Sequence, residues 1–358
     1  MRGFTVWAAF LAAFLVVGCG PKSEGTDAST GGSGGPKVSS GEGESVDAQG
    51  STFVQPFLSK VFAEFKTKTG FQINYTGGGS SAGIQGVVEG GAPFGASDAP
   101  MSDEEMSKAK GKILNIPIVL GAVAIAYNVP GVENGLKLDG AVLAEIFMSK
   151  IEKWNDPKIA ALNPGVTLPD LPIAVQVRAD GSGTTYVLSD FLSQVSEEWK
   201  SAMGTSKKLT WGPKAQQWPK SDGVANNTKQ TPGSITYVEL TWAKKSGLNY
   251  AAVKNAAGQF VLPDGAGITA AAAGVPIPDD FRVSIVNAPG ETSYPVSSFV
   301  FGLVPEDLTG NKFGKQVVEA IQYTVTDGQA FAEELDYAKL PQEVVDKVKA
   351  ALGGVKTQ

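Results

Sequence analysis

The sequence predicts an α/β protein whose folded part forms two lobes on mostly parallel sheets. Two observations predict this. Short apolar strands alternate with amphipathic helices along the chain, which is the order of units that build parallel sheets. The roughly 310 residues of 47–358 are also more than one hydrophobic core usually holds, so two lobes are expected.

The N-terminus has the features of a secretory signal. Arg2 precedes an apolar run of twelve residues, 6–17, and Gly18-Cys19 follows directly. A basic start, a run of this length and small residues before a cleavage site are typical of a signal peptide. The run is shorter than the about 20 residues that span a bilayer. We therefore expect residues 1–18 to be the signal peptide.

Cys19 is the only cysteine of the chain. A buried thiol is the usual interpretation of a lone cysteine, but Val16–Cys19 resembles a lipobox, in which the cysteine is lipidated. Residues 20–46 hold almost no large apolar side chain, so they cannot offset the entropy lost on ordering. We expect 19–46 to be a lipidated cysteine with a flexible linker, and the protein to be extracytoplasmic and membrane-anchored.

Local patterns define the elements of the first half. Residues 54–65 carry apolar side chains at helical spacing, and Gly70 suits the end of that helix. Ser102 and Glu105 form the pattern of a capping box. Strands are expected at 46–50, 71–76 and 94–98, and helices at 54–69, near 84–88 and at 102–110.

Residues 113–127 are almost wholly apolar. The stretch contains an Asn, a Pro and a Gly, and it is too short and too interrupted to span a membrane. A buried strand that bends at Gly121 and continues fits better. Such a strand could pass from one lobe to the other.

The second half continues the alternation of strands and helices. An apolar strand at 173–177 precedes a helix with apolar side chains on one face. The Trp, Pro and Gly content of 211–227 indicates an ordered surface loop. Further strands are expected at 234–240 and 283–286, and helices at 313–326 and 343–352.

The overall composition excludes several functions. The net charge is −6 and the pI about 5.0, whereas a nucleic-acid-binding protein normally presents a basic face. The chain has no histidine, which removes the commonest general base and metal ligand. With one cysteine there is no disulfide and no cysteine metal site. We expect no nucleic acid, metal or cofactor.

Three turns with the same pattern lie between a strand and a helix. They are 50–53, 79–81 and 180–184, and they are rich in Gly, Ser and Thr. The first N–H groups of a helix have no internal partner, and the helix dipole adds partial positive charge there. Several such ends together would form an anion site with little fixed charge. Helix capping explains any single turn more simply.

Two acidic residues and one arginine accompany these turns. Arg178 and Asp180 form either a local ion pair or an anion-binding guanidinium oriented by Asp180, at the strand end where α/β sheets bind ligands. Asp98 is either a turn carboxylate or an acceptor for a proton on the anion. Ionised Asp only accepts hydrogen bonds. It would therefore favour phosphate, which carries a proton near neutral pH, over sulfate, which does not.

Residues 79–83 match G-x-S-x-G, the pattern of a hydrolase nucleophile. That mechanism needs a base within reach of the serine, normally His, and the chain has none. A secreted phosphatase or hydrolase is the alternative from another functional class. We expect a binding protein and no enzyme.

At these loops the sequence closely resembles the phosphate-binding proteins of bacterial high-affinity phosphate ABC transporters. The resemblance covers nearly all of the chain after the linker. Gln49, Ser51 and Thr236 depart from the glycine-rich positions of that family. The matching stretches are GSTF from Gly50, GGGSSAG from Gly77, FGASDAPMSDE from Phe94, KIEKWNDPKIAALNPG from Lys150, RADGSGTT from Arg178 and LDYAKLP from Leu335.

The resemblance implies a ligand set for phosphate. Backbone N–H groups and hydroxyls would donate, Asp98 would accept the phosphate proton, and Arg178 would pair with the anion while Asp180 holds it. The implied phosphate-binding residues are Thr52, Phe53, Ser80, Asp98, Arg178, Asp180, Ser182, Gly183 and Thr184. A receptor for another protonated oxyanion, such as arsenate, stays open.

The resemblance also implies an architecture and partners. The fold would be the type II periplasmic-binding-protein fold, with mixed, mostly parallel sheets and two crossover strands near Gly121 and Val286. Lobe I would be 47–120 plus 287–358, and lobe II would be 121–286. The protein would be a lipid-anchored monomer that delivers phosphate to ABC transporter permease subunits in the cytoplasmic membrane.

Overall fold

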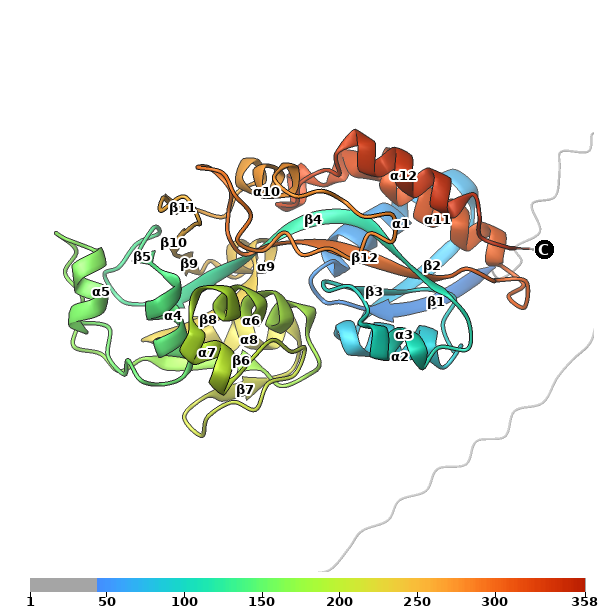
Figure 1. The fold of residues 1–358 in the computed structure, drawn as a ribbon. Helices are drawn as coiled ribbons and strands as arrows, with labels where there is room; N and C mark the ends of the chain where they lie inside the picture. The colour runs from blue at the N-terminus through green and yellow to red at the C-terminus, as the bar shows by residue number, and fades with distance from the viewer. Residues whose placement is uncertain (1–43, 358) are drawn as a thin grey trace, which may run out of the picture. The chain divides into compact units, whose positions relative to one another are not determined.

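A nine-stranded mixed sheet runs through residues 44–357, the part of the chain that the computed structural model describes (Figure 1). The predicted signal peptide 1–18, Cys19 and the linker up to residue 43 lie outside the described residues. In order across the sheet, the strands are β2 (Gln72–Gly77), β1 (Ser45–Gly50), β3 (Gly95–Ser97), β12 (Ser297–Pro305), β4 (Ile113–Asn128), β8 (Ser234–Glu239), β6 (Ala174–Arg178) and β7 (Gln216–Trp218), and β9 (Asn249–Tyr250) pairs with β4.

β4 connects two groups of strands. From Ile113 to Ala122 it pairs antiparallel with β12, and from Val123 to Asn128 it pairs antiparallel with β8. The predicted buried strand that continues past Gly121 is therefore confirmed. A glycine is needed there, because a Cβ at position 121 would lie 2.2 Å from the ring of Phe53. Within residues 44–357, no helix is long and apolar enough to cross a bilayer.

The first group of strands is parallel, as predicted. β1 pairs with β2 and β3, and β3 lies antiparallel to β12. The linker ends earlier than expected, because Ser45 and Val46 already pair with Gln72 and Ile73. The apolar stripe of α1 (Gln55–Thr69) is buried as predicted. Figure 1 shows α1, α11 (Gly314–Val325) and α12 (Gln342–Leu352) on one side of these strands, with α2 (Ser80–Val88) and α3 (Asp103–Ser107) on the other.

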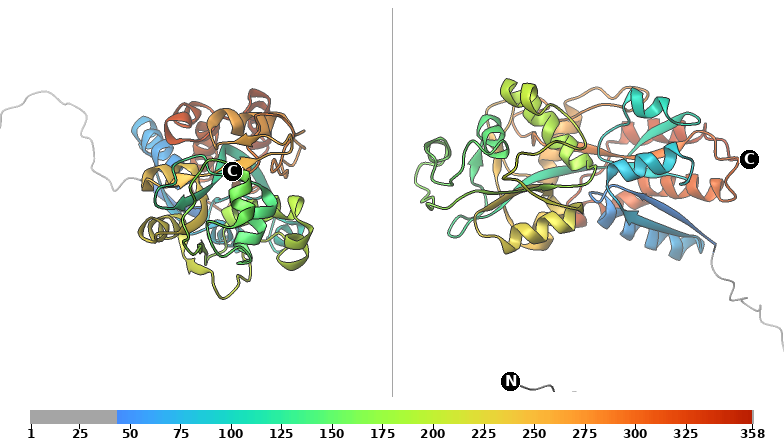
Figure 2. Two further views of the ribbon diagram at one scale, coloured as in Figure 1. Left: turned by 90° about the vertical axis from the view of Figure 1, so that its left-hand side faces the viewer. Right: turned by 90° about the horizontal axis from the view of Figure 1, so that it is seen from below.

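The second group is also parallel, with β6 between β7 and β8. The prediction of a surface loop over 211–227 is wrong in part. β7 forms because its backbone pairs with β6, and α8 (Lys220–Gln230) begins directly after Pro219. The other helices of this group are α4 (Gly140–Phe147), α5 (Pro157–Leu162), α6 (Gly183–Val195), α7 (Glu197–Ala202) and α9 (Leu240–Ser246). The two groups lie at the two ends of β4 (Figure 2).

The strand expected at 283–286 does not form. Ile285 and Val286 are buried, as their apolar side chains indicate, but their backbone joins no ladder. Val286 N–H donates to Ser284 Oγ instead, at 3.3 Å. The remaining elements are a small sheet of β11 (Phe260–Val261), β10 (Ala252–Lys254) and β5 (Lys137–Leu138), the helix α10 (Gly265–Ala273), and the 3-10 turns Asp327–Phe331 and Glu333–Leu335.

Candidate anion-binding site

Loops at the carboxyl ends of β1, β2, β3 and β6 bring the predicted residues into one cluster. Open α/β sheets bind ligands at this edge because the helix starts that follow the strands meet there. The loops hold different members of the set, and all are buried except Asp180, which is partly exposed. The members are Thr52, Phe53, Ser80, Asp98, Arg178, Asp180, Ser182, Gly183 and Thr184.

Asp98 lies at the centre of the cluster and is 2% exposed. Ser51 Oγ donates to Asp98 Oδ1, while Ser80 Oγ and Thr184 Oγ1 lie 3.4 and 3.5 Å from Asp98 Oδ2. The two longer distances exceed those of good O–H···O bonds. Asp98 Oδ2 therefore has weak partners and can accept a further hydrogen bond.

Burial raises the pKa of Asp98 to about 7. The hydrogen bond from Ser51 and the charge of Arg178 work against this shift, and the negative charge of Glu239 adds to it. A carboxyl with this pKa is partly ionised near neutral pH. It can therefore accept or donate a hydrogen bond according to what lies beside it.

The starts of α2 and α6 meet at Ser80. Ser80 Oγ accepts the N–H of Gly183 at 3.0 Å and the N–H of Asp98 at 3.2 Å. The capping interpretation is correct for Ser182, whose Oγ accepts the N–H of Thr185. No side chain at all fits on Gly183, because a Cβ there would lie 2.5 Å from Ser80 Oγ and 2.6 Å from Asp98 Oδ2.

Arg178 is held on two sides. Its Nε and Nη2 donate to the two carboxylate oxygens of Asp180 at 2.9 and 2.5 Å, and its Nη1 donates to Ser221 Oγ at 3.1 Å. Burial opposes ionisation of both partners, but their pairing outweighs it, raising the pKa of Arg178 and lowering that of Asp180. A guanidinium has five N–H donors. Two remain for another ligand, so the local ion pair and an anion-binding role are compatible.

Thr52 contacts helices of the second group of strands, whereas Phe53 packs against Tyr337, with the ring centroids 6.1 Å apart. Thr52 Oγ1 lies 2.6 Å from Ser221 Oγ, and Trp242 Nε1 donates to the carbonyl oxygen of Thr52 at 3.2 Å. The N–H of Phe53 donates to Ser51 Oγ at 2.9 Å. Hydrogen bonds thus join the loop after β1 to residues of α8 and α9.

The structure adds three buried residues that the sequence analysis missed. Ser51 was noted only as a departure from a glycine-rich loop, Ser221 lay in the supposed surface loop, and Glu239 lay within the strand predicted at 234–240. Glu239 had a usable signal, because β8 is parallel to β6 and its carboxyl end reaches the same sheet edge. Glu239 Oε1 accepts from Thr184 Oγ1 at 2.8 Å and from Ser221 Oγ at 2.9 Å.

The cluster lacks the usual base of a serine hydrolase, because the chain has no histidine. The serine of the G-x-S-x-G pattern is Ser81, which is exposed, whereas its neighbour Ser80 lies 3.4 Å from Asp98 Oδ2. Among residues 44–357, no group of three His, Cys, Asp or Glu side chains is arranged to hold a metal ion. The arrangement can bind an anion through N–H and O–H donors.

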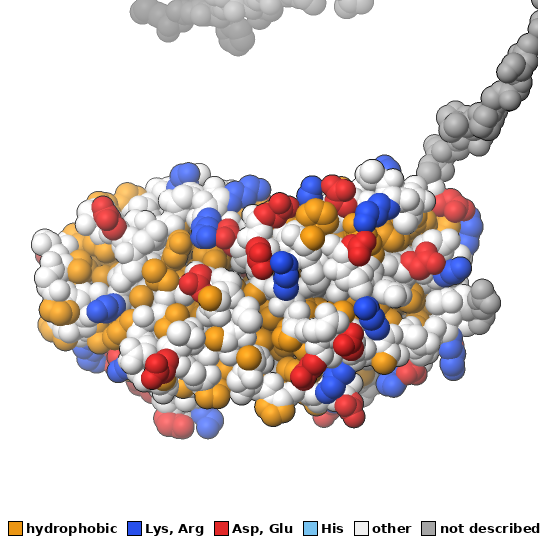
Figure 3. Space-filling view, turned by 90° about the horizontal axis from the view of Figure 1, so that it is seen from above, with side chains coloured by type: hydrophobic (Ala, Val, Ile, Leu, Met, Phe, Trp, Pro, Cys, Tyr) orange, Lys and Arg blue, Asp and Glu red, His pale blue; other side chains and the backbone are white. Residues whose placement is uncertain are grey.

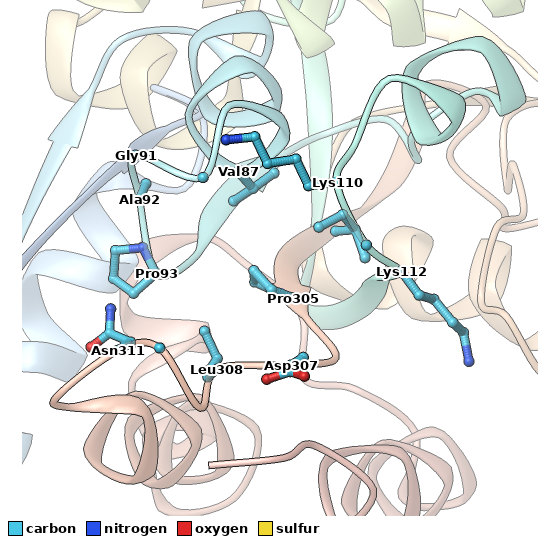
Figure 4. A pocket seen from close by; sticks show the side chains of 14 residues that line it. Val87, Gly91, Ala92, Pro93, Lys110, Lys112, Pro305, Asp307, Leu308 and Asn311 are labelled. Atoms are coloured by element: carbon cyan, nitrogen blue, oxygen red, sulfur yellow. The ribbon is translucent and has the colours of Figure 1, made fainter. Parts of the chain in front are cut away.

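A separate surface pocket of about 490 Å³ contains two lysines (Figure 4). It lies between the end of α2 and residues 305–311, and it shares no residue with the cluster. Lys112 already pairs with Glu306 at 2.7 Å. On the face shown in Figure 3, acidic and basic side chains are interspersed. Neither feature competes with the buried cluster as a specific anion site.

Comparison with known proteins defines the class first. A family model described as a PBP superfamily domain matches residues 27–324. Solved structures give the same fold. A periplasmic phosphate-binding protein (PfluDING) has a TM-score of 0.69 at 21% identity, with 86% of this chain and 93% of that chain covered. A human phosphate-binding apolipoprotein has a TM-score of 0.68 at 21% identity, over 85% and 93%. The expected periplasmic-binding-protein fold is thus confirmed.

Curated relatives then define the family. A phosphate-binding protein PstS of Pasteurella multocida is 38% identical, with 86% of this chain and 90% of the relative covered. A protein of the same name from Xylella fastidiosa is 35% identical over 97% and 96%. One from Methanocaldococcus jannaschii is 32% identical over 84% and 83%. The chain belongs to this family of PBP-superfamily proteins named PstS.

Proposed function

We propose that this chain binds inorganic phosphate outside the cytoplasm and delivers it to the permease of an ABC transporter. The family assignment supports this function, and the convergence of four loops on Asp98 and Arg178 is the observation that carries it. A buried anion is costly unless it is fully hydrogen-bonded. The cluster offers the needed donors and only one guanidinium.

Bound phosphate would replace hydrogen bonds that the residues of the cluster make with one another. The two remaining N–H groups of Arg178 would pair with anion oxygens, since guanidinium–phosphate bonds are strong and directional. Backbone N–H groups at the start of α6 and hydroxyls of the β1 and β2 loops would donate as well. Asp98 would accept the proton that phosphate carries, which gives the site its preference over sulfate.

Binding requires the cluster to open. We assign lobe I to 47–120 plus 287–358 and lobe II to 121–286, with a hinge where β4 passes Gly121. Thr52, Ser80 and Asp98 then belong to lobe I, and Arg178 and Gly183 belong to lobe II. Closure of two lobes around a ligand is the usual motion of periplasmic binding proteins.

The remaining features of the protein follow from the same proposal. A lipid on Cys19 would hold the protein at a membrane, and residues up to the start of β1 would be the tether. The protein would act as a monomer without catalysis, because delivery needs only binding and release. Arsenate offers the same shape and protonation as phosphate, so the site would accept it as a competing ligand.

Calorimetric titration of the protein with phosphate, sulfate and arsenate tests the proposal. We expect phosphate to bind with a Kd of about 1 μM or lower, near −8 kcal/mol, and sulfate to bind at least tenfold more weakly. Equal affinity for phosphate and sulfate would exclude the Asp98 role, and binding of neither would exclude the function. If arsenate bound more tightly than phosphate, arsenate would be the preferred ligand of the site. Turnover of a chromogenic phosphate ester, lost in Ser80→Ala or Ser81→Ala, would instead indicate a phosphatase.

A further inference from the structure

Three successive carbonyl groups of the loop after β1 each accept a hydrogen bond from an aromatic side chain. The donors come from β2, from α9 and from the segment after the second 3-10 turn, and none of them belongs to the implied ligand set. The bonds run from Tyr75 Oη to the carbonyl oxygen of Ser51 at 2.8 Å, from Trp242 Nε1 to that of Thr52 at 3.2 Å, and from Tyr337 Oη to that of Phe53 at 2.6 Å.

These bonds fix the direction of the N–H groups in the same loop. A peptide unit is planar and trans, so its N–H points away from its C=O. The carbonyl of Ser51 shares a peptide unit with the N–H of Thr52, and the carbonyl of Thr52 shares one with the N–H of Phe53. Tyr75 and Trp242 therefore hold the peptide units of the two residues that this loop contributes to the implied ligand set.

The N–H of Phe53 points into the cluster. It donates to Ser51 Oγ at 2.9 Å, and Ser51 Oγ donates in turn to Asp98 Oδ1. A phosphate oxygen that took the place of Ser51 Oγ would accept the same N–H. A hydrogen bond to the carbonyl of a peptide unit also polarises that unit, which makes its N–H a stronger donor.

Trp242 differs from the two tyrosines because it belongs to the other proposed lobe. Its helix α9 lies within 121–286, whereas the tyrosines and the loop after β1 lie within lobe I. Lys245 Nζ lies 4.7 Å from the centre of the Trp242 ring, a cation–π contact that helps to hold the indole in place. The bond from Trp242 to Thr52 crosses the proposed cleft, so it forms only when the lobes are closed.

We propose that Tyr75 and Trp242 are positioning residues, which orient the N–H groups of Thr52 and Phe53 toward the bound anion. The inference rests on the proposed function. Tyr75 holds the N–H of Thr52 within lobe I, whether the lobes are open or closed. Trp242 holds the N–H of Phe53 only after closure. Closure of the lobes thus completes the donor set of a loop that belongs to lobe I.

Trp242→Phe and Tyr75→Phe test the two positions, because each variant removes one donor and keeps an aromatic ring. A carbonyl that loses its partner can rotate, and the N–H of the same peptide unit then rotates away from the anion. We expect calorimetry to show a phosphate Kd raised roughly threefold to tenfold in each variant, since each loses one oriented hydrogen bond.

Each variant has a matched control outside the cluster. Trp154 Nε1 donates to the carbonyl oxygen of Gly233 at 2.9 Å, just before β8 and at the end of that strand away from the cluster. Tyr127 Oη donates to the carbonyl oxygen of Glu133. Both bonds lie within one proposed lobe. Trp154→Phe and Tyr127→Phe should therefore bind phosphate as wild type does.

NMR separates the orientation of an N–H from a loss of packing. Thr52-Phe53 is the only Thr-Phe pair of the chain. Protein labelled with ¹³C at the threonine carbonyl and ¹⁵N at phenylalanine therefore gives a single signal for the N–H of Phe53. With phosphate bound we expect this proton signal downfield, as a short bond to a charged oxygen causes. Trp242→Phe should move it upfield, and Trp154→Phe should leave it unchanged.

The outcomes distinguish the two levels of the proposal. Wild-type protein that does not bind phosphate would overturn the proposed function and this inference with it. If wild type binds phosphate, an unchanged Kd in Trp242→Phe, or a raised Kd with an unmoved Phe53 signal, would overturn the role of Trp242 alone. Circular dichroism verifies folding. If Trp242→Phe does not fold, Tyr75→Phe must raise the Kd and move the N–H signal of Thr52, or the inference fails.

Discussion

At the scale of single residues, we propose that one carboxylate and one guanidinium determine what the cluster binds. Asp98 has weak partners on Oδ2 and a pKa near 7, and Arg178 keeps two N–H donors beyond Asp180 and Ser221. The first property suits a proton-bearing ligand, and the second suits an oxyanion. Their proximity is why the proposed ligand is a protonated oxyanion rather than any anion.

Asp98→Asn should keep the fold and reduce the preference for phosphate over sulfate. An amide can donate a hydrogen bond to sulfate, which the carboxylate cannot do when ionised. We expect the ratio of the two Kd values, measured by calorimetry at pH 7.5, to fall at least tenfold. A variant with wild-type selectivity would show that Asp98 does not recognise the proton of the bound phosphate.

The same variant tests the electrostatics of the closed cluster without ligand. The pKa of Asp98 is higher in the folded protein than in the unfolded chain, so the folded state binds more protons between about pH 4 and 7. The contribution of the Asp98 carboxyl to the free energy of unfolding therefore falls as pH rises through that window, by at most about 1.4 kcal/mol per pH unit. Urea unfolding from pH 5 to 8 should show a steeper fall for wild type than for Asp98→Asn. If the free energy of unfolding depended on pH in the same way in both proteins, the raised pKa of the buried Asp98 carboxyl would be contradicted.

Arg178→Ala should weaken phosphate binding at least tenfold, about 1.4 kcal/mol, because the buried anion loses its only guanidinium. Lys158 is the control, because it pairs with Glu145 inside one proposed lobe and lies outside the cluster. Calorimetry of Lys158→Ala should give wild-type affinity. Wild-type affinity in Arg178→Ala would leave that residue with a structural role only.

At the scale of elements, the start of α6 must approach the β2 and β3 loops without a side chain between them. Gly183→Ala should weaken phosphate binding at least tenfold, since its Cβ would lie within 2.6 Å of both Ser80 Oγ and Asp98 Oδ2. Gly265 occupies the same first position in α10, with open space around it. Gly265→Ala should therefore bind phosphate as wild type does. An equal effect of the two substitutions would rule out the close approach as the cause.

Most elements and most of the cluster could be predicted from local patterns, while pairings distant in sequence could not. The α1 stripe, the capping box at Ser102 and the long apolar strand are local signals, and all three are confirmed. The strand expected at 283–286 does not form, because apolar side chains bury the segment but do not by themselves place another strand beside its backbone. Ser221 lies at the start of α8, three residues after β7. The sequence analysis took this segment for a loop, because β7 forms only through its pairing with β6.

At the scale of the whole folded unit, closure depends on contacts between the proposed lobes. Lys207 donates to both carboxylate oxygens of Glu105, at 2.8 and 2.9 Å, and the lysine side chain is 11% exposed. Thr241 Oγ1 donates to the carbonyl oxygen of Leu335 at 2.5 Å. Both contacts join residues from different proposed lobes, so they stabilise the closed arrangement in which the cluster is complete.

Glu105→Gln should raise the phosphate Kd by about threefold to tenfold, because a partly buried ion pair across the lobes is lost. The glutamine still completes the capping box with Ser102, so α3 stays intact. Glu104→Gln is the control, since Glu104 pairs with Lys108 on the exposed face of the same helix. An unchanged Kd in Glu105→Gln, measured by calorimetry beside this control, would show that the Lys207 pair does not contribute to closure.

A crystal structure of the protein grown with phosphate tests the central claim most directly. We predict one phosphate within the cluster, with oxygens accepting two N–H bonds from Arg178 and a short hydrogen bond of about 2.5–2.7 Å to an Asp98 carboxylate oxygen. Phosphate bound elsewhere, such as beside Lys110 in the surface pocket, with Asp98 and Arg178 still bonded only to their present partners, would contradict the account.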